Sequence, residues 1–421
     1  MVPELLRDEI VNMARVVLIT PYFWPDIAAN VPLMTSLCED LKKYGHQVTV
    51  LTSYPGKGID YDNQYRFRKT RSTPEYFAGA RVWRFSNFFV GRLGSFSKLM
   101  EYLIFTFWVI LTSIILSRRT DVFFVYSNPP LLGWPLYIAT RLGRSRIIYN
   151  LQDLFPDSAI DNGQIKNHFV IKLLKLMEKR NYACASVVSV ISEAFAQHVK
   201  AVSPNTSVAL VPNWIDLEII RPIPKEENLF LQKIRLSHKF IVLYAGNLGF
   251  AQNLELVLKA AKLLQINQEI IFVIVGEGQQ KQYLKAKIQE DGLNNVNIFP
   301  FQPEELVAHV YSACDIGLVT MKPETGLSSV PSKAWSIMGC ERPVVASIDK
   351  SSDLASIIEQ SQSGLVVRPD DAKLLVDAIL QLYANTAFRY DLGKNGRRYV
   401  ENTISRKVIT RMYCELIDSL V

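Results

Sequence analysis

The chain of 421 residues has few of the residues that bind metals or form disulfides. Its five cysteines and five histidines are scattered, with no C-x-x-C pair and no H-E-x-x-H or H-x-x-E-H motif. We therefore expect no metal or other cofactor, and free thiols in a reducing cytosol. The first ten residues include acidic side chains and no apolar run of signal-peptide length, so we expect no export signal.

Motifs of several nucleotide-binding and hydrolytic classes are also missing. The sequence has no G-x-x-x-x-G-K-[ST] loop, no G-x-S-x-G turn, and no G-x-G-x-x-G after its first apolar run. ATPase, serine hydrolase and dinucleotide-binding classes lose support accordingly.

The composition is that of a large globular protein with one basic region. Hydrophobic residues make up 49% and charged residues 21%, enough for two or three domains. Residues 1–150 hold 18 Lys and Arg against 11 Asp and Glu, which equals the whole net charge of +7. This asymmetry favours an anionic partner, either a polyanion or a membrane surface.

An apolar segment at 99–116 decides between these partners. Its uncharged part, from Tyr102, has about fifteen residues, whereas a span needs roughly 20. It is a buried helix, a helix in the membrane interface, or a span, and the sequence leaves all three open. The preceding basic and aromatic stretch, 61–92, is compatible with nucleic acid, but its place beside an apolar helix favours a membrane, so we expect no nucleic acid partner.

Short apolar runs alternate with amphipathic segments throughout, which predicts two doubly wound parallel sheets. In the first half we expect strands at 14–21, 47–52, 121–127, 146–150, 186–191 and 208–211, and helices at 31–44, 99–116, 131–142 and 169–183. In the second half we expect strands at 240–245, 270–275, 296–299, 316–320, 343–347 and 364–367, and helices at 254–264, 281–290, 372–384 and 405–420.

The domain boundary is predicted from a change in composition. Residues 221–239 are charged and rich in proline, as in a linker or an exposed connecting helix. We expect a first domain at 1–215, a linker at 216–239 and a second domain at 240–399. The helix at about 400–421 is expected to pack back on the first domain.

Polar groups follow several predicted strands, at the sheet edge where such folds bind ligands. In the second half, Lys333 opens a helix and adds a cation to an N-terminus that attracts anions, which predicts a phosphate site there. A plain βαβ connection with a solvated lysine is the alternative. Glycine loops after two other strands, 246–249 and 276–278, let a ligand approach the backbone. In the first half, Asp153 follows a strand and is a candidate for the chemistry, although such a residue can also be a turn cap.

Five segments in order resemble the GT-B glycosyltransferases of family 4, among bacterial transferases of exopolysaccharide and O-antigen assembly similar to the colanic-acid fucosyltransferase group. The segments are Pro21-Tyr-Phe-Trp-Pro-Asp26, Gln152-Asp-Leu-Phe-Pro-Asp157, Val211-Pro-Asn-Trp-Ile-Asp216, Tyr244-Ala-Gly-Asn-Leu-Gly249 and Val275-Gly-Glu-Gly278, followed by Pro331-Ser-Lys333. Together they span nearly the whole chain.

The resemblance implies two Rossmann-like domains facing across a cleft and transfer of a hexosyl or N-acetylhexosaminyl group with retention. The donor is a nucleotide sugar, and the acceptor is a lipid-linked saccharide or a glycan. The implied location is the cytoplasm, at the inner face of the plasma membrane. Asp153 and Lys333 are the implied catalytic residues, and Asp26 and Asn30 lie on the acceptor side. The implied donor-binding residues are Gly246, Asn247, Gly249, Gly276, Glu277, Gly278, Ser332, Lys333 and Ser336.

The sequence departs from the family at the donor site. Two glutamates with seven residues between them are usual, but counting back from Arg342 places Ser328 and Ser336 there, and Glu324 lies four residues too early. The usual arginine and lysine of the first glycine loop correspond to Asn247 and Gln252. Lys333 is then expected to carry more of the diphosphate charge. A nucleotide-sugar epimerase and a silent binding subunit are the alternatives.

Overall fold

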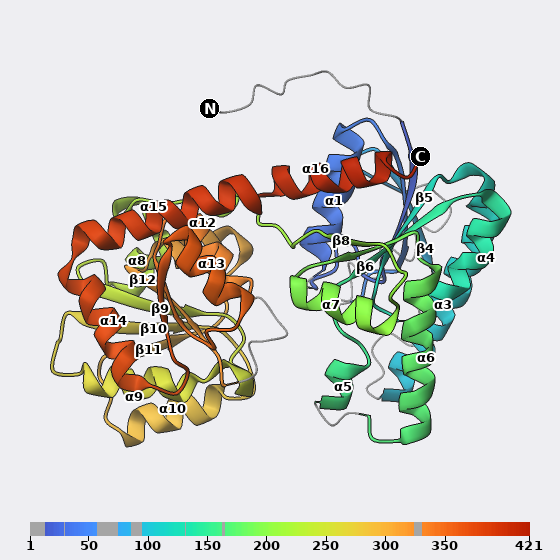
Figure 1. The fold of residues 1–421 in the computed structure, drawn as a ribbon. Helices are drawn as coiled ribbons and strands as arrows, with labels where there is room; N and C mark the ends of the chain where they lie inside the picture. The colour runs from blue at the N-terminus through green and yellow to red at the C-terminus, as the bar shows by residue number, and fades with distance from the viewer. Residues whose placement is uncertain are drawn as a thin grey trace. The chain divides into compact units, whose positions relative to one another are not determined.

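The computed structural model describes residues 13–28, 30–56, 75–85, 95–130, 132–161, 165–323 and 331–421. The chain forms two compact units. Unit 1 comprises residues 1–213 and 409–421, and unit 2 comprises residues 214–408 (Figure 1).

Unit 1 is built on an eight-stranded sheet in the order β3-β4-β2-β1-β5-β6-β7-β8. All neighbours are parallel except β3, which pairs antiparallel with β4. The central strands are buried apolar runs, as the sequence predicts. The strands are β1 (Arg15–Ile19), β2 (Gln47–Ser53), β3 (Glu75–Phe77), β4 (Ala80–Phe85), β5 (Val122–Tyr126), β6 (Arg146–Leu151), β7 (Val187–Val190) and β8 (Val208–Leu210).

Helices pack on both faces of this sheet. One core joins the strands to α3, α4, α6 and α7, while Tyr413 of α16 packs on Phe124 from the other face. The helices are α1 (Val31–Lys43), α3 (Ser95–Leu116), α4 (Gly133–Gly143), α5 (Asp157–Asp161), α6 (His168–Cys184), α7 (Glu193–Val202) and α16 (Arg406–Asp418), with the 3₁₀ turn η1 (Ser117–Arg119). Gly45 ends α1 with a positive φ of 94°, and Ser192 caps α7 by accepting from the Phe195 N–H.

Unit 2 is built on a six-stranded parallel sheet in the order β11-β10-β9-β12-β13-β14. Its strands are β9 (Phe240–Ala245), β10 (Ile270–Val275), β11 (Val296–Phe299), β12 (Ile316–Thr320), β13 (Val344–Ser347) and β14 (Gly364–Val367). The order reverses between β9 and β12, so their carboxyl ends form the switch point at which such sheets bind ligands.

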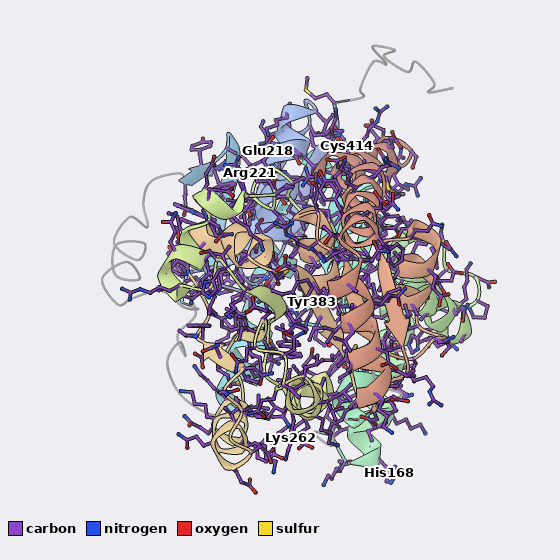
Figure 2. The ribbon with its side chains drawn as sticks, turned by 90° about the vertical axis from the view of Figure 1, so that its left-hand side faces the viewer. His168, Glu218, Arg221, Lys262, Tyr383 and Cys414 are labelled. Atoms are coloured by element: carbon purple, nitrogen blue, oxygen red, sulfur yellow. The ribbon has the colours of Figure 1, made fainter. Side chains whose placement is uncertain are left out.

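Helices surround the second sheet as well. They are α8 (Leu229–Ile234), α9 (Leu254–Leu263), α10 (Lys281–Glu290), α11 (Val307–Ser312), α12 (Lys333–Gly339), α13 (Asp353–Ser361), α14 (Ala372–Ala384) and α15 (Thr386–Thr403), with 3₁₀ turns η2 (Lys225–Glu227), η3 (Phe250–Gln252) and η4 (Glu304–Leu306). Tyr383 of α14, labelled in Figure 2, packs its ring edge-on against Phe240 with centroids 5.0 Å apart. The predicted fold class of two doubly wound α/β domains is confirmed.

The segment 216–239 is part of unit 2 rather than a free connection. Phe230 and Leu231 of α8 are 0% exposed and pack with Ile241, Leu243 and other residues under the sheet. We expected a linker because prolines and charged residues dominate the sequence around this helix. Its two core residues could not be recognised in that pattern. At the other end of the chain, residues 409–421 group with unit 1.

The predicted helix at 99–116 is α3, and it is apolar on two sides for different reasons. Phe105 and Val109 are 2% and 0% exposed and belong to the core of unit 1. Phe107 and Ile115, on the opposite side, are 60% and 66% exposed. Among the described residues, the segment Met100–Arg119 is the one long and apolar enough to cross a membrane, with a mean hydropathy of 1.8, and 33% of it is buried. Length and composition alone are weak support for a span, because core helices meet the same criteria.

Candidate functional site

The strongest candidate site in unit 2 is centred on Lys333, the first residue of α12. Its Nζ donates hydrogen bonds to the Tyr244 hydroxyl at 2.8 Å and to Gln252 Oε1 at 2.6 Å. It also lies 4.1 Å from the centre of the Tyr244 ring. Tyr244 in turn donates to the Asn247 carbonyl at 2.8 Å. The ammonium is thus held at the carboxyl end of β9 by neutral groups.

Burial lowers the pKa of Lys333 to about 7. The physical cause is desolvation, which disfavours the charged amine. An anion beside the amine favours the charged form again and raises the pKa. Lys333 therefore has the properties of a cation that becomes fully charged when an anionic ligand is bound.

The glycine loops beside Lys333 pack closely on each other. A Cβ on Gly276 would lie 2.0 Å from the Gly246 oxygen, and one on Gly278 would lie 2.6 Å from the Leu248 oxygen. Backbone bonds from Gly246 to Val275 and from Leu248 to Glu277 join the two loops. From the sequence, we explained these glycines by the close approach of a ligand to the backbone. The structure gives Gly276 and Gly278 another reason, which is close approach of one loop to the other.

The first glycine loop borders the lysine directly. Gly246 has φ +146°, and a Cβ there would lie 3.3 Å from Lys333 Cε. At Gly249, a Cβ would lie 2.9 Å from the Asn247 amide nitrogen. Small residues at these two positions leave room for the amine and for the loop that carries Asn247.

The other predicted donor-site residues lie at the same sheet edge but differ in exposure. Asn247, Glu277 and Ser332 are exposed, and Glu277 forms an ion pair with Lys281. Ser336 is half-buried and faces Tyr311 of α11. Burial raises the pKa of Tyr311 to about 12, and a hydrogen bond with Ser336 opposes this shift.

Two further expectations concern the positions of the usual glutamates and the anion site at the start of α12. Glu324 and Ser328 lie outside the described residues. The α12 helix has only seven residues, and Ser332 makes no side-chain capping bond. The site is therefore defined by the Lys333 side chain rather than by a long helix dipole.

Two residues that hold Lys333 were not identified as site residues from the sequence. Tyr244 reads as part of an apolar strand, and Gln252 was noted only as an uncharged replacement for a lysine. In the structure, Lys333 Nζ lies on the Gln252 side chain itself. The charge that the sequence lacks at position 252 is supplied there by a residue 81 positions further along the chain.

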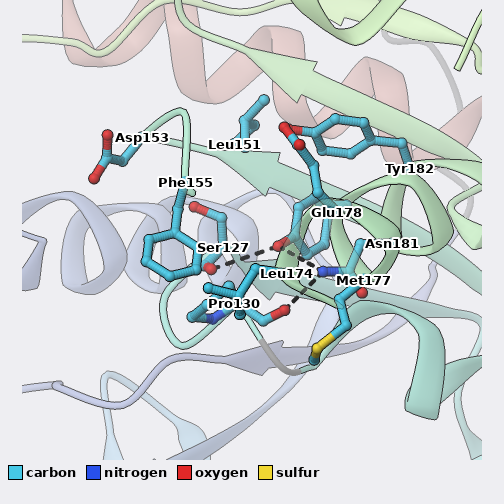
Figure 3. A pocket seen from close by; sticks show the side chains of 11 residues that line it. Ser127, Pro130, Leu151, Asp153, Phe155, Leu174, Met177, Glu178, Asn181 and Tyr182 are labelled. Atoms are coloured by element: carbon cyan, nitrogen blue, oxygen red, sulfur yellow. Dashed lines mark hydrogen bonds between the residues drawn. The ribbon is translucent and has the colours of Figure 1, made fainter. Parts of the chain in front are cut away.

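In unit 1, Asp153 lies just after β6 and is exposed. It lines a small cavity with Ser127, Leu151 and Phe155, and α6 forms the opposite wall (Figure 3). Figure 3 shows the carboxylate at the rim, directed away from the interior. An exposed carboxylate at a sheet edge can accept a hydrogen bond from a substrate hydroxyl.

One residue of the cavity wall, the buried Glu178, pairs with the partly exposed His198 of α7. Glu178 accepts from the Tyr182 hydroxyl at 3.0 Å and contacts His198 Nε2 at 2.7 Å. The hydrogen bond to Glu178 raises the pKa of His198, against the opposing effect of burial. Sequence reasoning missed this pair. The spacing of Glu178 and Tyr182, one helical turn apart, signals the hydrogen bond between these two but not the contact with His198.

The two predicted acceptor-side residues are both buried; Asn30 bonds within the loop after β1, and Asp26 bonds to the segment that follows β2. Asp26 Oδ1 accepts from the Gly56 N–H at 2.8 Å. The Asn30 amide donates to Thr20 Oγ1 at 3.0 Å and to the Tyr22 carbonyl at 3.1 Å. The geometry supports a role for both in shaping the loop after β1.

No group of three or more His, Cys, Asp or Glu side chains suited to a metal occurs in the part of the chain that the structure describes. The expectation that no cofactor is needed stays a prediction.

Two family models match the chain. The "Glycosyl transferase 4-like domain" matches residues 32–214, and "Glycosyl transferases group 1" matches residues 226–399. A similar curated protein is the probable glycosyltransferase WbjE of Pseudomonas aeruginosa, 27% identical over 75% of this chain and 76% of the relative. Another is the putative colanic acid biosynthesis glycosyl transferase WcaI of Escherichia coli K12, 24% identical over 92% of this chain and 96% of that protein.

A solved structure with the same fold is Anabaena Alr3699/HepE in complex with UDP-glucose. Its TM-score is 0.68 at 16% identity, with 96% of this chain and 100% of that chain covered. The two family models occupy the two structural units in order, and the expected resemblance is confirmed. The chain belongs to the GT-B glycosyltransferases, with a family 4-like first domain and a group 1 second domain.

Proposed function

We propose that this glycosyltransferase moves a hexosyl or N-acetylhexosaminyl group from a nucleotide sugar to a lipid-linked saccharide or glycan, with retention. The reaction belongs to exopolysaccharide or lipopolysaccharide biosynthesis in the cytoplasm, at the inner membrane. The name of WcaI, which refers to colanic acid biosynthesis, supports the pathway. The UDP-glucose bound to the Anabaena protein supports the donor class.

The observation that carries the proposal is the placement of Lys333 at the switch point of unit 2. When the glycosyl bond breaks, negative charge develops on the departing nucleoside diphosphate. A preorganised cation stabilises that charge without rearranging at the moment of reaction. The bonds to Tyr244 and Gln252 fix the amine in advance.

The remaining residues have supporting roles in the proposal. Backbone N–H groups of Asn247 and Gly249 would help to bind the diphosphate, because those of Gly246 and Leu248 donate to the neighbouring loop. Ser336 would approach the ribose. Asp153, which is exposed at the edge of the first sheet, would accept a hydrogen bond from the acceptor hydroxyl.

A panel of nucleotide sugars incubated with the purified protein and a membrane lipid extract tests the function. We expect release of nucleoside diphosphate from one donor, stimulated by the extract, and a product whose anomeric configuration, read by NMR, matches that of the donor. Conversion of a donor to its epimer without acceptor would support the epimerase alternative. Tight donor binding with no release would support a silent binding subunit, and either result contradicts the proposal.

A further inference from the structure

Three neighbouring helices of unit 1 expose large apolar side chains. The helix α4 packs between α3 and α6, on the same face of the sheet (Figure 1). We name this surface the α3–α4–α6 face. It is defined by Phe107, Ile115, Ile138, Leu142, Phe169 and Leu173, which are 60%, 66%, 52%, 58%, 77% and 48% exposed. Several large apolar side chains exposed on adjacent helices indicate an interaction surface.

The buried side of α3 keeps this helix attached to the sheet and limits how deeply it can enter a membrane. Phe105 and Val109 pack in the core of the sheet, and Thr112 and Ser113 are buried at 5% and 0% exposure. Moving α3 across a bilayer would remove these side chains from unit 1 and leave the core open to water. The helix can therefore place its outer side in a membrane interface while it stays attached to the sheet.

The exposed charges on these helices are basic. Arg118 and Arg119 follow α3, Arg141 lies on α4, and Lys172 and Lys179 lie on α6, all of them exposed. The acidic residues of the same described segments are less exposed to solvent. Glu101 is half-buried, and Glu178 is buried against His198. Apolar side chains with basic residues around them complement an anionic bilayer, because each basic residue near the surface is attracted to the negatively charged headgroups.

The helix α6 connects this face to the candidate acceptor site. Leu173 and Leu176 point outward and are each 48% exposed, whereas Leu174 and Met177 line the cavity whose rim carries Asp153 (Figure 3). A saccharide whose lipid carrier stays in the bilayer would thus be presented close to Asp153.

We infer that the α3–α4–α6 face binds the surface of an anionic lipid bilayer peripherally, and that the acceptor is the lipid-linked class rather than a soluble glycan. The assignment of the acceptor rests on the proposed transferase function. Binding to the bilayer stands on the exposed side chains and charges alone.

Vesicle flotation of the full-length protein tests the inference. We expect binding to vesicles of phosphatidylethanolamine with phosphatidylglycerol, weaker binding to phosphatidylcholine alone, and release by high salt or alkaline carbonate. The double variants F107S/I115S and L142S/L173S should each lower the vesicle partition coefficient by at least about tenfold, since each removes two large apolar side chains. The matched control is I266S/F301S in unit 2, which changes side chains that are 94% and 55% exposed and should bind vesicles like the wild type.

Other outcomes overturn the inference, and UDP binding measured by calorimetry separates it from the proposed function. Variants that fold by circular dichroism but keep wild-type vesicle binding contradict it. So does carbonate-resistant membrane insertion, or a dimer in light scattering that the same variants dissociate without any vesicle binding. If UDP binds and vesicles do not, the surface assignment fails while the transferase proposal stands. If vesicles bind and neither UDP nor any nucleotide sugar does, the proposed function fails while the surface stands.

Discussion

Each unit of the chain holds a basic side chain away from solvent, but the two have different partners. The Lys333 ammonium of unit 2 donates to the Tyr244 hydroxyl and the Gln252 amide oxygen, which are neutral. The His198 imidazole of unit 1 contacts the carboxylate of Glu178. A carboxylate completes an ion pair, whereas neutral acceptors leave the positive charge available to a ligand. The comparison indicates that His198 stabilises the fold, whereas Lys333 is available to bind an anionic ligand.

The two sites should also respond to pH in opposite ways. Burial lowers the pKa of Lys333 to about 7, so between pH 7 and the ordinary lysine pKa of 10.5 the unfolded chain binds more protons than the folded one. This contribution makes the folded protein more stable as the pH rises through that window. The pKa of His198 is raised above 6.5, so its contribution is fully present below that pH and is lost as the pH rises through the folded pKa.

The largest expected effect comes from removing the unit 2 cation. Lys333→Met should lower the rate of nucleoside diphosphate release by about 10³-fold, because a charged contact to the leaving group is lost. The folded state should be no less stable, since methionine needs no hydration in that position. Steady-state kinetics and urea unfolding check the two statements.

The matched control for this variant is Lys262→Met. Lys262, labelled in Figure 2, is 58% exposed and pairs with Asp291 in the same unit. Its turnover should equal that of the wild type. Turnover of Lys333→Met within about tenfold of the wild type would remove Lys333 from the site.

The next effect concerns the exposed carboxylate of unit 1. Asp153→Asn should slow transfer to acceptor by about 10²-fold, because the amide cannot accept a proton from the acceptor hydroxyl. Thermal unfolding and UDP affinity should not change, since Asp153 is exposed. An equal loss of UDP affinity would show that Asp153 acts on the donor side.

A smaller effect is expected from pH alone. Above pH 7, the affinity of the wild type for UDP should fall by up to about tenfold per pH unit, because binding must protonate Lys333. Calorimetry in buffers of different ionisation enthalpy should record uptake of a proton. Lys333→Met should lack both the slope and the uptake, and a pH-independent affinity in the wild type would contradict the assignment.

The smallest effect on activity comes from the paired cation. His198→Gln should lower the free energy of unfolding by about 1–3 kcal/mol near pH 6, through loss of a hydrogen bond to a charged group, and by less at pH 9. Nucleoside diphosphate release should be unchanged. His168→Gln, an exposed change at the start of α6 that is labelled in Figure 2, serves as control and should leave stability unchanged.

Most strands were predictable because they are buried on both faces and read as continuous apolar runs. The expected strands at 240–245, 270–275 and 316–320 coincide with β9, β10 and β12, whose residues are all buried. The pair β3 and β4 was missed, since basic and aromatic residues at a sheet edge conceal the alternation. The helix α15 was missed because two internal glycines argue against a helix. They are required by packing, since a Cβ on Gly393 would lie 2.3 Å from the Glu341 oxygen and one on Gly396 would lie 3.0 Å from Met338.

The candidate site was predictable in part. Lys333 and the glycine loops could be placed at one sheet edge because parallel strands share their carboxyl ends. The contact between Lys333 and Gln252 could not be predicted, because it depends on the conformation of η3 after β9. Burial of Asn30 could not be predicted either, since a polar residue before a helix is more often an exposed cap.

The last helix has a consequence for how the protein is made. Tyr413 of α16 accepts a hydrogen bond of 2.8 Å from the amide of Asn150, which is 1% exposed in the middle of the first sheet. A ribosome delivers these two residues far apart in time, with all of unit 2 between them. The contact between Asn150 and Tyr413 can therefore form only after all of unit 2 has been synthesised, so the first domain completes its fold late.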